Sequence, residues 1–313
     1  MNEKLVEILE RFKHFESVYE KDMVNAAIEL KEEITPYLIA VLENLLANPN
    51  EYLENPDRFD HIYTVMLLSH FREAVAHKIL IDVFSLPDRL SNNLFGDIVT
   101  EDLPMILLRT SNGSLEHIKA MALNKNVNDY CRYSALRAMA YATFEGIAIR
   151  EDVLAFYGTL FSGQEADIKS DLWSLLASLV YDFYPEELID TISRAYKDGL
   201  IYPGMIDYPS FELALSRDKE EHLEKFRKDF KRRSLDNIHD CMSWWHCFNP
   251  ESKRLSPEIE SLFPTDYPAE VPHAEVPHAK FSMGQLTMNT KKQKRDKKKK
   301  RKMSKVSKRK NRR

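Results

Sequence analysis

Three carboxylates surround a threonine in the segment Gly96–Pro104, and side chains of this type and spacing can serve two purposes. Asp97, Glu101 and Asp102 offer oxygen ligands for a divalent metal, or negative charge for a contact with a partner. The structural alternative is that Thr100 caps a helix and the acids occupy its first turn, where the helix dipole favours them. The residue types favour the structural role. They also make Asp97, Thr100, Glu101 and Asp102 the candidate partner-binding residues of the helical body, and we predict no bound metal.

Histidine and cysteine gather once, near the end of the helical part of the chain. The group consists of His239, Cys241, His246 and Cys247. Zinc needs four converging ligands, usually from two short pairs separated by a loop. Here all four fall within nine residues of one expected helix, 219–248, in which Cys241 would point away from His246. The pattern therefore favours a packing segment over a zinc site. Its aromatic anchors would be Trp244, Trp245 and Phe248.

A third arrangement combines two histidines and a glutamate. His70, Glu73 and His77 lie at i, i+3 and i+7, which would place them on one face of a helix. Such a face could supply two metal ligands and a base, but the spacing matches neither zinc-protease pattern and no third ligand is apparent. An ion-paired helix surface is the simpler interpretation. We predict no catalytic residue, no cofactor and no enzyme activity.

The strongest functional signal is a charge asymmetry. The last 23 residues hold 16 Lys and Arg and one acid, Asp296, whereas the whole chain holds 45 basic and 49 acidic residues. Residues 1–290 therefore carry a net charge of about −19, and residues 291–313 carry about +15. The predicted nucleic-acid-binding residues are Lys291, Lys292, Lys294, Arg295, Lys297, Lys298, Lys299, Lys300, Arg301, Lys302, Lys305, Lys308, Arg309, Lys310, Arg312 and Arg313.

A polycation of this density displaces condensed counterions from a phosphate polymer. The tail contains no aromatic residue that could stack on bases, so a preference for one base sequence is not expected. We predict that the tail binds RNA, the ribosome or another polyanion. Two alternatives stay open: a solubilising tail that binds its own acidic body, and a nuclear or nucleolar address in runs such as Lys297–Lys302.

The elements that must position these groups are helical, because almost every segment up to residue 248 has helical periodicity. The first stripe is formed by Leu5, Ile8, Leu9, Phe12 and Phe15. A second helix begins near Val24, and a third is expected to start at Pro36, whose fixed φ suits a first turn. Further helices are expected at about 59–69, 72–85, 104–110, 115–123, 130–143, 151–161, 168–183, 186–197 and 219–248.

Short polar links between amphipathic helices indicate stacked antiparallel pairs. Segments 128–139 and 166–176 resemble each other at a spacing near 38 residues, and each begins at an aspartate suited to helix capping, Asp129 and Asp167. That period is close to the period of HEAT repeats. The predicted fold class is all-α, an α-α superhelix (a HEAT- or armadillo-like solenoid) followed by a disordered basic tail. An irregular helical bundle is the alternative.

Composition divides the chain into three parts. Residues 1–249 are the predicted helical domain, and 250–288 form a proline-rich linker with a direct Ala-Glu-Val-Pro-His repeat. Residues 289–313 form the polybasic tail, which has too little apolar area to offset the entropy of ordering. The three cysteines make no disulfide framework, and no run of 18 apolar residues or standard signal peptide is present. We therefore expect no membrane span and a cytoplasmic location.

Four segments together resemble a known family. They are the run Gly96–Pro104, the apolar helix Tyr63–Phe71 with the following Arg-Glu, the helix Arg132–Ala140, and the closing Ser243–Phe248. Over roughly residues 1–248 the chain resembles the bacterial proteins that share the domain of unknown function numbered 1186. The resemblance implies a HEAT-like α-α superhelix and no assigned activity. Some relatives look as if they end in a Cys-rich zinc motif, and this chain has the polybasic tail instead.

The combined interpretation is a non-enzymatic scaffold or adaptor. Its helical surface would bind a protein partner, and its tail would bind RNA, the ribosome or another polyanion. The alternative is an exported bacterial effector whose tail directs it to the nucleus of a host cell. The partner's identity and the oligomeric state are not encoded in any motif of the sequence.

Overall fold

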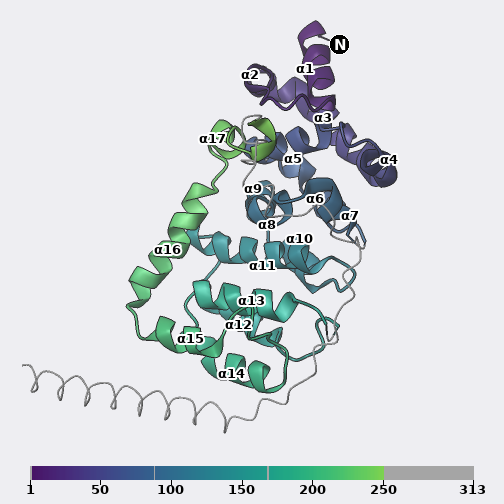
Figure 1. The fold of residues 1–313 in the computed structure, drawn as a ribbon. Coiled ribbons are helices and arrows are strands. Elements are labelled where there is room, and N and C mark those ends of the chain that lie inside the picture. The colour runs from purple at the N-terminus through teal and green to yellow at the C-terminus, as the bar shows by residue number, and fades with distance from the viewer. Residues whose placement is uncertain (1, 88, 168, 250–313) are drawn as a thin grey trace, which may run out of the picture. The chain divides into compact units, whose positions relative to one another are not determined.

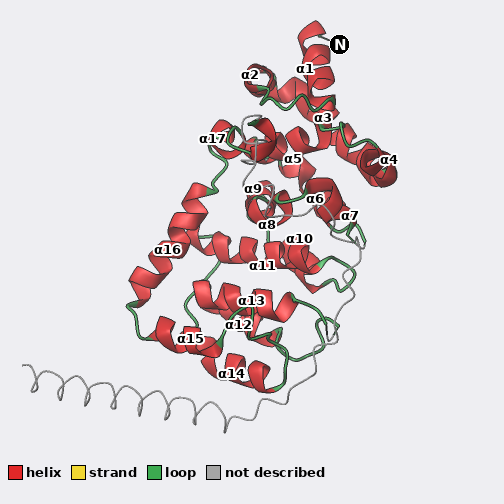
Figure 2. Cartoon of the chain, viewed as in Figure 1, coloured by secondary structure: helices red, strands yellow, loops and turns green. Residues whose placement is uncertain are grey.

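The computed structural model describes residues 2–87, 89–167 and 169–249 (Figure 1). The described residues belong to one compact unit. The linker at 250–288 and the polybasic tail at 289–313, with all of its predicted binding residues, lie outside the described residues. Within the described ranges the regular elements are all helical, with no strand, which confirms the all-α fold class (Figure 2).

The described residues contain seventeen α-helices and three 3₁₀ turns, joined by loops. The first ten helices are α1 Glu3–Lys13, α2 Lys21–Glu29, α3 Lys31–Ala47, α4 Pro49–Glu54, α5 Asp60–His70, α6 His77–Phe84, α7 Leu90–Phe95, α8 Ile98–Glu101, α9 Leu103–Thr110 and α10 Glu116–Leu123. The others are α11 Asp129–Phe144, α12 Arg150–Thr159, α13 Leu172–Asp182, α14 Ile189–Lys197, α15 Tyr208–Leu215, α16 Lys219–Arg232 and α17 Ile238–Met242. The 3₁₀ turns are η1 Ala74–Ala76, η2 Glu186–Leu188 and η3 His246–Phe248.

The first stripe forms as its spacing requires. Leu5, Ile8 and Phe12 are buried on one face of α1, and the Asn2 side chain caps the helix by accepting from the Lys4 amide. The Phe12 ring stacks on Tyr63 of α5 at a centroid distance of 4.3 Å. Burial of this stripe holds the N-terminal helix against the rest of the unit.

Pro36 does not begin a helix as predicted. It lies inside α3, which starts at Lys31 and is separated from α2 by Leu30 alone. The proline lacks the amide proton that would bond the Glu32 carbonyl, but the Thr35 hydroxyl donates to the Lys31 carbonyl at 2.8 Å. The buried stripe runs through the proline: Ile34, Leu38, Leu42 and Leu45. Its burial outweighs the loss of one hydrogen bond.

Successive helices stack in a row. Helix α5 packs on α9, α9 on α11 and α11 on α13, while α6 packs on α10 beside them. The segments predicted to repeat every 38 residues form α11 and α13, which begin 43 residues apart at Asp129 and Leu172. Asp167 therefore does not cap α13, because Asp171 is the N-cap residue of that helix. The row is compatible with stacked pairs, and the HEAT-like superhelix stays a prediction.

The C-terminal helices return along this row. Figure 1 shows α16 running from α15 back beside the stack, and α17 contacts α5. The single helix predicted at 219–248 is therefore wrong. Leu235 has a φ of +56°, a left-handed conformation that ends the helical path, and the Asn237 side chain caps α17 by accepting from the His239 amide. This break lets α17 and η3 turn over the N-terminal helices.

Candidate binding cleft

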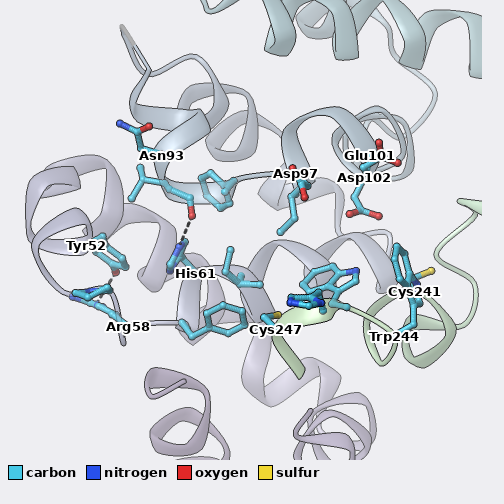
Figure 3. Close-up of a pocket in the computed structure, with 18 of the residues that line it drawn as sticks. Tyr52, Arg58, His61, Asn93, Asp97, Glu101, Asp102, Cys241, Trp244 and Cys247 are labelled. Carbon is cyan, nitrogen blue, oxygen red and sulfur yellow. Dashed lines mark hydrogen bonds between the residues drawn. The ribbon is translucent and has the colours of Figure 1, made fainter. Parts of the chain in front are cut away.

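A cleft of about 1000 Å³ opens where this returning segment faces the short helices α4, α7 and α8. Figure 3 shows Asp97, Glu101 and Asp102 on one side and Cys241, Trp244 and Cys247 on the other. Its charged and histidine lining residues are Arg58, His61, Asp97, Glu101, Asp102, Arg232, Arg233, Asp240 and His246. Two regions that the sequence analysis treated separately thus meet in one place, although about 140 residues of sequence separate them.

The acidic wall depends on two breaks in the helical path. Gly96 follows α7 with a φ of +52°, which only glycine adopts without strain, and the chain then makes the single turn α8. Pro104 sits in the first turn of α9, so a second helix starts directly after Asp102. The predicted capping role of Thr100 is wrong. Its hydroxyl donates to the Asp97 carbonyl at 3.3 Å, and Thr100 does not line the cleft.

The three acids of this wall differ in their exposure and in the groups that they contact. Glu101 is exposed and forms an ion pair with Arg233, whose Nη1 also donates to the Glu101 carbonyl at 2.7 Å. Asp97 is exposed, and its carboxylate accepts no hydrogen bond from the residues described. Asp102 is half-buried. Burial raises its pKa to about 7, although the charge of Arg233 opposes the shift and that of Glu101 adds to it.

The histidine and cysteine group is divided by the fold. Cys241, His246 and Cys247 line the cleft, whereas His239 bonds Tyr19 through Nδ1 and Asn25 through Nε2 at 2.9 and 2.8 Å. In the parts of the chain that the structure describes, no group of three or more His, Cys, Asp or Glu residues is placed to hold a metal. Burial raises the pKa of Cys241 to about 11, and the charge of Asp102 adds to this shift. A thiol with this pKa stays protonated at neutral pH and is a poor nucleophile.

The predicted packing segment is confirmed in part. Phe248 is buried against Phe15, Phe59 and Tyr63, and the Trp245 ring stacks on it at 5.9 Å. Trp244, however, is 68% exposed and lines the cleft. It follows the C-cap residue of α17, in the turn before η3, so its side chain does not share the buried face of a longer helix.

His70, Glu73 and His77 do not share a helix face. Helix α5 ends at His70 and α6 begins at His77, because Arg72 between them has a φ of +54°. His70 Nδ1 bonds the Leu235 carbonyl at 3.0 Å, and His77 Nδ1 bonds the Thr110 hydroxyl at 3.0 Å. Glu73 accepts from the Val75 amide. The trio serves three separate structural contacts, and not the ion-paired surface that we predicted.

Two buried arginine networks, which the sequence analysis did not identify, hold the cleft wall in place. Arg109 of α9 donates to the Ser69, His70 and Ser234 carbonyls and to Asp236, which fixes the connection between α16 and α17. Arg233 joins Glu101 of α8 to Asp229 of α16. The side chains of both arginines are largely buried. A lone arginine, Arg109, directly after the apolar run 103–108 was the sequence signal for such a contact.

The fold and the cleft define the class of this protein: an all-helical unit whose candidate binding site lies between two distant segments of the chain. Residues 3–249 match the family model described as protein of unknown function (DUF1186), and the chain belongs to this family. The resemblance inferred from the sequence is thereby confirmed. The match ends at residue 249, so the polybasic tail lies outside the part that the family shares.

Two chlamydial proteins are similar to most of the chain. One, from Chlamydia trachomatis serovar D, is 27% identical over 242 residues, which covers 77% of this chain and 94% of the relative. The other, from Chlamydia muridarum, is 26% identical over 248 residues, covering 78% of this chain and 98% of the relative. Both are described only as uncharacterized proteins. No solved structure matches. No helix of the described residues has the length and hydropathy that a membrane crossing requires.

The raised pKa of Asp102 predicts a pH-dependent stability. Its folded pKa exceeds the ordinary value near 4, so ionising it in the native state costs free energy once the pH rises through the interval from 4 to 7. We expect the substitution Asp102→Asn to raise the free energy of unfolding at pH 8 by about 2 kcal/mol, a figure reduced for partial exposure. At pH 4 the gain should nearly vanish. Urea unfolding at the two pH values measures it, and an equal gain at both would contradict the assignment.

Proposed function

We propose that the protein is a non-enzymatic adaptor whose cleft binds a protein partner and whose polybasic tail binds RNA, the ribosome or another polyanion. The observation that carries the proposal is the cleft itself. It combines a volume of about 1000 Å³ with an exposed tryptophan, Trp244, and with charged side chains from two distant segments. Exposed aromatic anchors inside concave surfaces are typical of protein-binding sites.

The chemistry of the lining supports binding over catalysis. The pKa of Cys241 disfavours a thiolate nucleophile, and the lining arginines are held in ion pairs with carboxylates. Arg58, for example, donates to Asp60 and Glu51 and its guanidinium lies 3.6 Å from the centroid of the Tyr52 ring. Groups fixed in this way shape a surface and are not free to move protons for a reaction.

The proposed role of the tail follows from its charge. The segment 291–313 carries about +15, and such a segment binds phosphate polymers by releasing their counterions. Because this segment lies beyond the region matched by the family, the two binding activities are separable by deletion. An adaptor of this kind would bring the partner of the cleft to a polyanion.

One capture experiment tests both activities. The full chain, a chain without residues 289–313, Trp244→Ala and Tyr202→Ala are each used to capture proteins and RNA from a bacterial lysate, with and without nuclease. Tyr202 is the matched control because it is 66% exposed and does not line the cleft. We expect the tail deletion to remove the nuclease-sensitive fraction, and Trp244→Ala to remove nuclease-resistant proteins that Tyr202→Ala retains.

The contradictory outcomes are equally specific. Unchanged RNA recovery after deletion of the tail would show that the tail is not the polyanion-binding segment. If Trp244→Ala and Tyr202→Ala retain the same nuclease-resistant proteins as the full chain, the cleft is not the partner-binding site.

A further inference from the structure

We propose that the cleft accepts a segment of a protein partner that carries lysine or arginine, with its cationic groups placed against Trp244 and the carboxylates of Asp97 and Asp240. This inference rests on the proposed function, because it assigns the chemistry of the partner at the same cleft. It depends on three features of the lining: the distribution of free charge, the exposed tryptophan, and the two sides from which the acids come.

The first feature is that the arginines of the lining are paired with carboxylates more fully than its acids are paired with cations. The lining contains four acids and three arginines, but each arginine is paired with a carboxylate outside the lining. Arg58 pairs with Asp60 and Glu51, and both Arg232 and Arg233 pair with Asp229. Arg58 is therefore compensated by carboxylates behind the lining, whereas Arg232 and Arg233 share the single carboxylate of Asp229 and are compensated in part.

The acids are compensated far less. Of the four acids that line the cleft, only Glu101 forms an ion pair with an arginine of the described residues. The Asp97 carboxylate accepts no hydrogen bond from them, and Asp240 accepts one from the neutral Asn237 side chain at 2.8 Å. Asp102 adds little to this charge, because burial raises its pKa to about 7 and its carboxyl group is partly protonated at neutral pH. The cleft therefore presents uncompensated negative charge, which complements a cation and repels an anion.

The second feature is the indole of Trp244. It is 68% exposed and follows α17, beside Cys241 in Figure 3. Indole is the aromatic ring that binds ammonium and guanidinium groups best, through the negative potential of its face. A lysine or arginine side chain can also cover the ring with its methylene groups, so that both its charge and its apolar stem are satisfied.

The third feature is that acidic side chains line both walls of the cleft. Asp97 comes from the α8 wall, whereas Asp240 and Trp244 come from the α17 wall. Cationic side chains on an extended segment could reach both walls, whereas a single small cation would have too few carboxylates at any one point. The failure of these residues to form a metal-binding group is consistent with a peptide ligand.

Binding of a labelled peptide to the full chain tests this inference. The probes are three fluorescein-labelled decapeptides on a Gly-Ser background, carrying two lysines and two arginines, four glutamates, or no charged residue. Fluorescence anisotropy is measured at low and moderate salt. We expect the basic peptide to bind and the other two to bind weakly or not at all.

Matched variants separate the cleft from general charge attraction. The double variant Asp97→Asn with Asp240→Asn should weaken binding of the basic peptide about tenfold, and Trp244→Ala about fivefold. Asp152→Asn with Asp190→Asn removes the same charge from two exposed acids outside the cleft, and Tyr202→Ala removes an exposed ring. Both controls should stay within about twofold of the full chain. All the substituted side chains are exposed, so the fold should be retained, which circular dichroism verifies.

Three outcomes overturn the inference. The first is an equal loss of affinity in the cleft double variant and the control double variant, which would mean attraction to the acidic body as a whole. The second is a preference for the acidic or the uncharged peptide. The third is no binding of the basic peptide. If Trp244→Ala still loses nuclease-resistant proteins in the capture experiment, the proposed function stands while the basic partner is rejected.

Discussion

Replacement of Arg109 with methionine is expected to lower the free energy of unfolding by about 4 kcal/mol. The Arg109 side chain is 4% exposed, and its guanidinium donates to the Ser69 and His70 carbonyls at the end of α5 and to the Ser234 carbonyl and Asp236 before α17, at 2.6 to 3.1 Å. Methionine fills similar volume but removes the guanidinium donor from the Ser69, His70 and Ser234 carbonyls, and loss of hydrogen bonds to partly or fully buried carbonyls is costly. Denaturant unfolding at neutral pH measures the loss.

The matched control is Arg72→Met. Arg72 lies beside the same network, 3.9 Å from Asp236, but its side chain is 49% exposed. An exposed ion pair contributes little, so we expect a change within about 0.5 kcal/mol. If Arg109→Met is no more destabilising than this control, the return of α17 does not depend on the arginine. If the large loss is found, binding of the basic peptide should fall as well, because the α17 wall is no longer fixed.

The helices themselves could be predicted because each depends on local sequence. Periodic apolar residues at i, i+3 and i+4 mark a buried face, and α1, α5, α9, α10, α11 and α12 appear where that pattern places them. The short helices α7 and α8 escaped prediction because one or two turns contain too few positions to establish a period. They are nevertheless the helices that carry the acidic wall of the cleft.

The breaks between helices were the least predictable feature. Arg72 and Leu235 have left-handed φ values near +55°, although neither is glycine or asparagine. Local propensity does not favour this conformation, so the residue types at these two positions do not predict it. After the turn at Arg72, the Glu73 backbone amide donates a hydrogen bond to the Leu68 carbonyl, and at Leu235 the side chain is fully buried. Tertiary packing therefore decides both breaks, and it divided the expected helix 219–248.

Half of the candidate site could be found from the sequence. Asp97, Glu101 and Asp102 lie close together in the sequence, so this cluster of acids could be recognised without a structure. Their partners were not, because Trp244 and Asp240 approach them only through the return of α16 and α17. Trp244 was predicted to pack, since a tryptophan beside another tryptophan and a phenylalanine favours a core position. Its exposure depends on the turn before η3, which local sequence does not specify.

The second large effect is expected for Asp229→Asn, which should lower the free energy of unfolding at pH 7 by about 3 kcal/mol. Asp229 of α16 accepts from Tyr141 at 2.6 Å, from Arg232 at 2.7 Å and from Arg233 at 3.1 Å, and forms an ion pair with Arg137 of α11. The side chains of Arg137 and Arg233 are 13% and 14% exposed. Without the carboxylate, two largely buried guanidinium groups lose their common counter-charge.

The pH dependence of this loss gives its most specific test. Burial alone would raise the pKa of Asp229, but the hydrogen bond from Tyr141 and the charges of Arg137 and Arg233 hold it far below its ordinary range. A depressed folded pKa stabilises the native state above the unfolded value near pH 4, and the contribution is lost as the pH falls toward the folded pKa. The gap between wild type and Asp229→Asn should therefore be constant from pH 6 to 8 and shrink below pH 4. Asp152→Asn, an exposed acid on α12, should show neither effect. Since Arg233 also holds Glu101 at the cleft, a gap that persists unchanged at pH 3 would mean that packing of α16, and not this carboxylate, positions the wall.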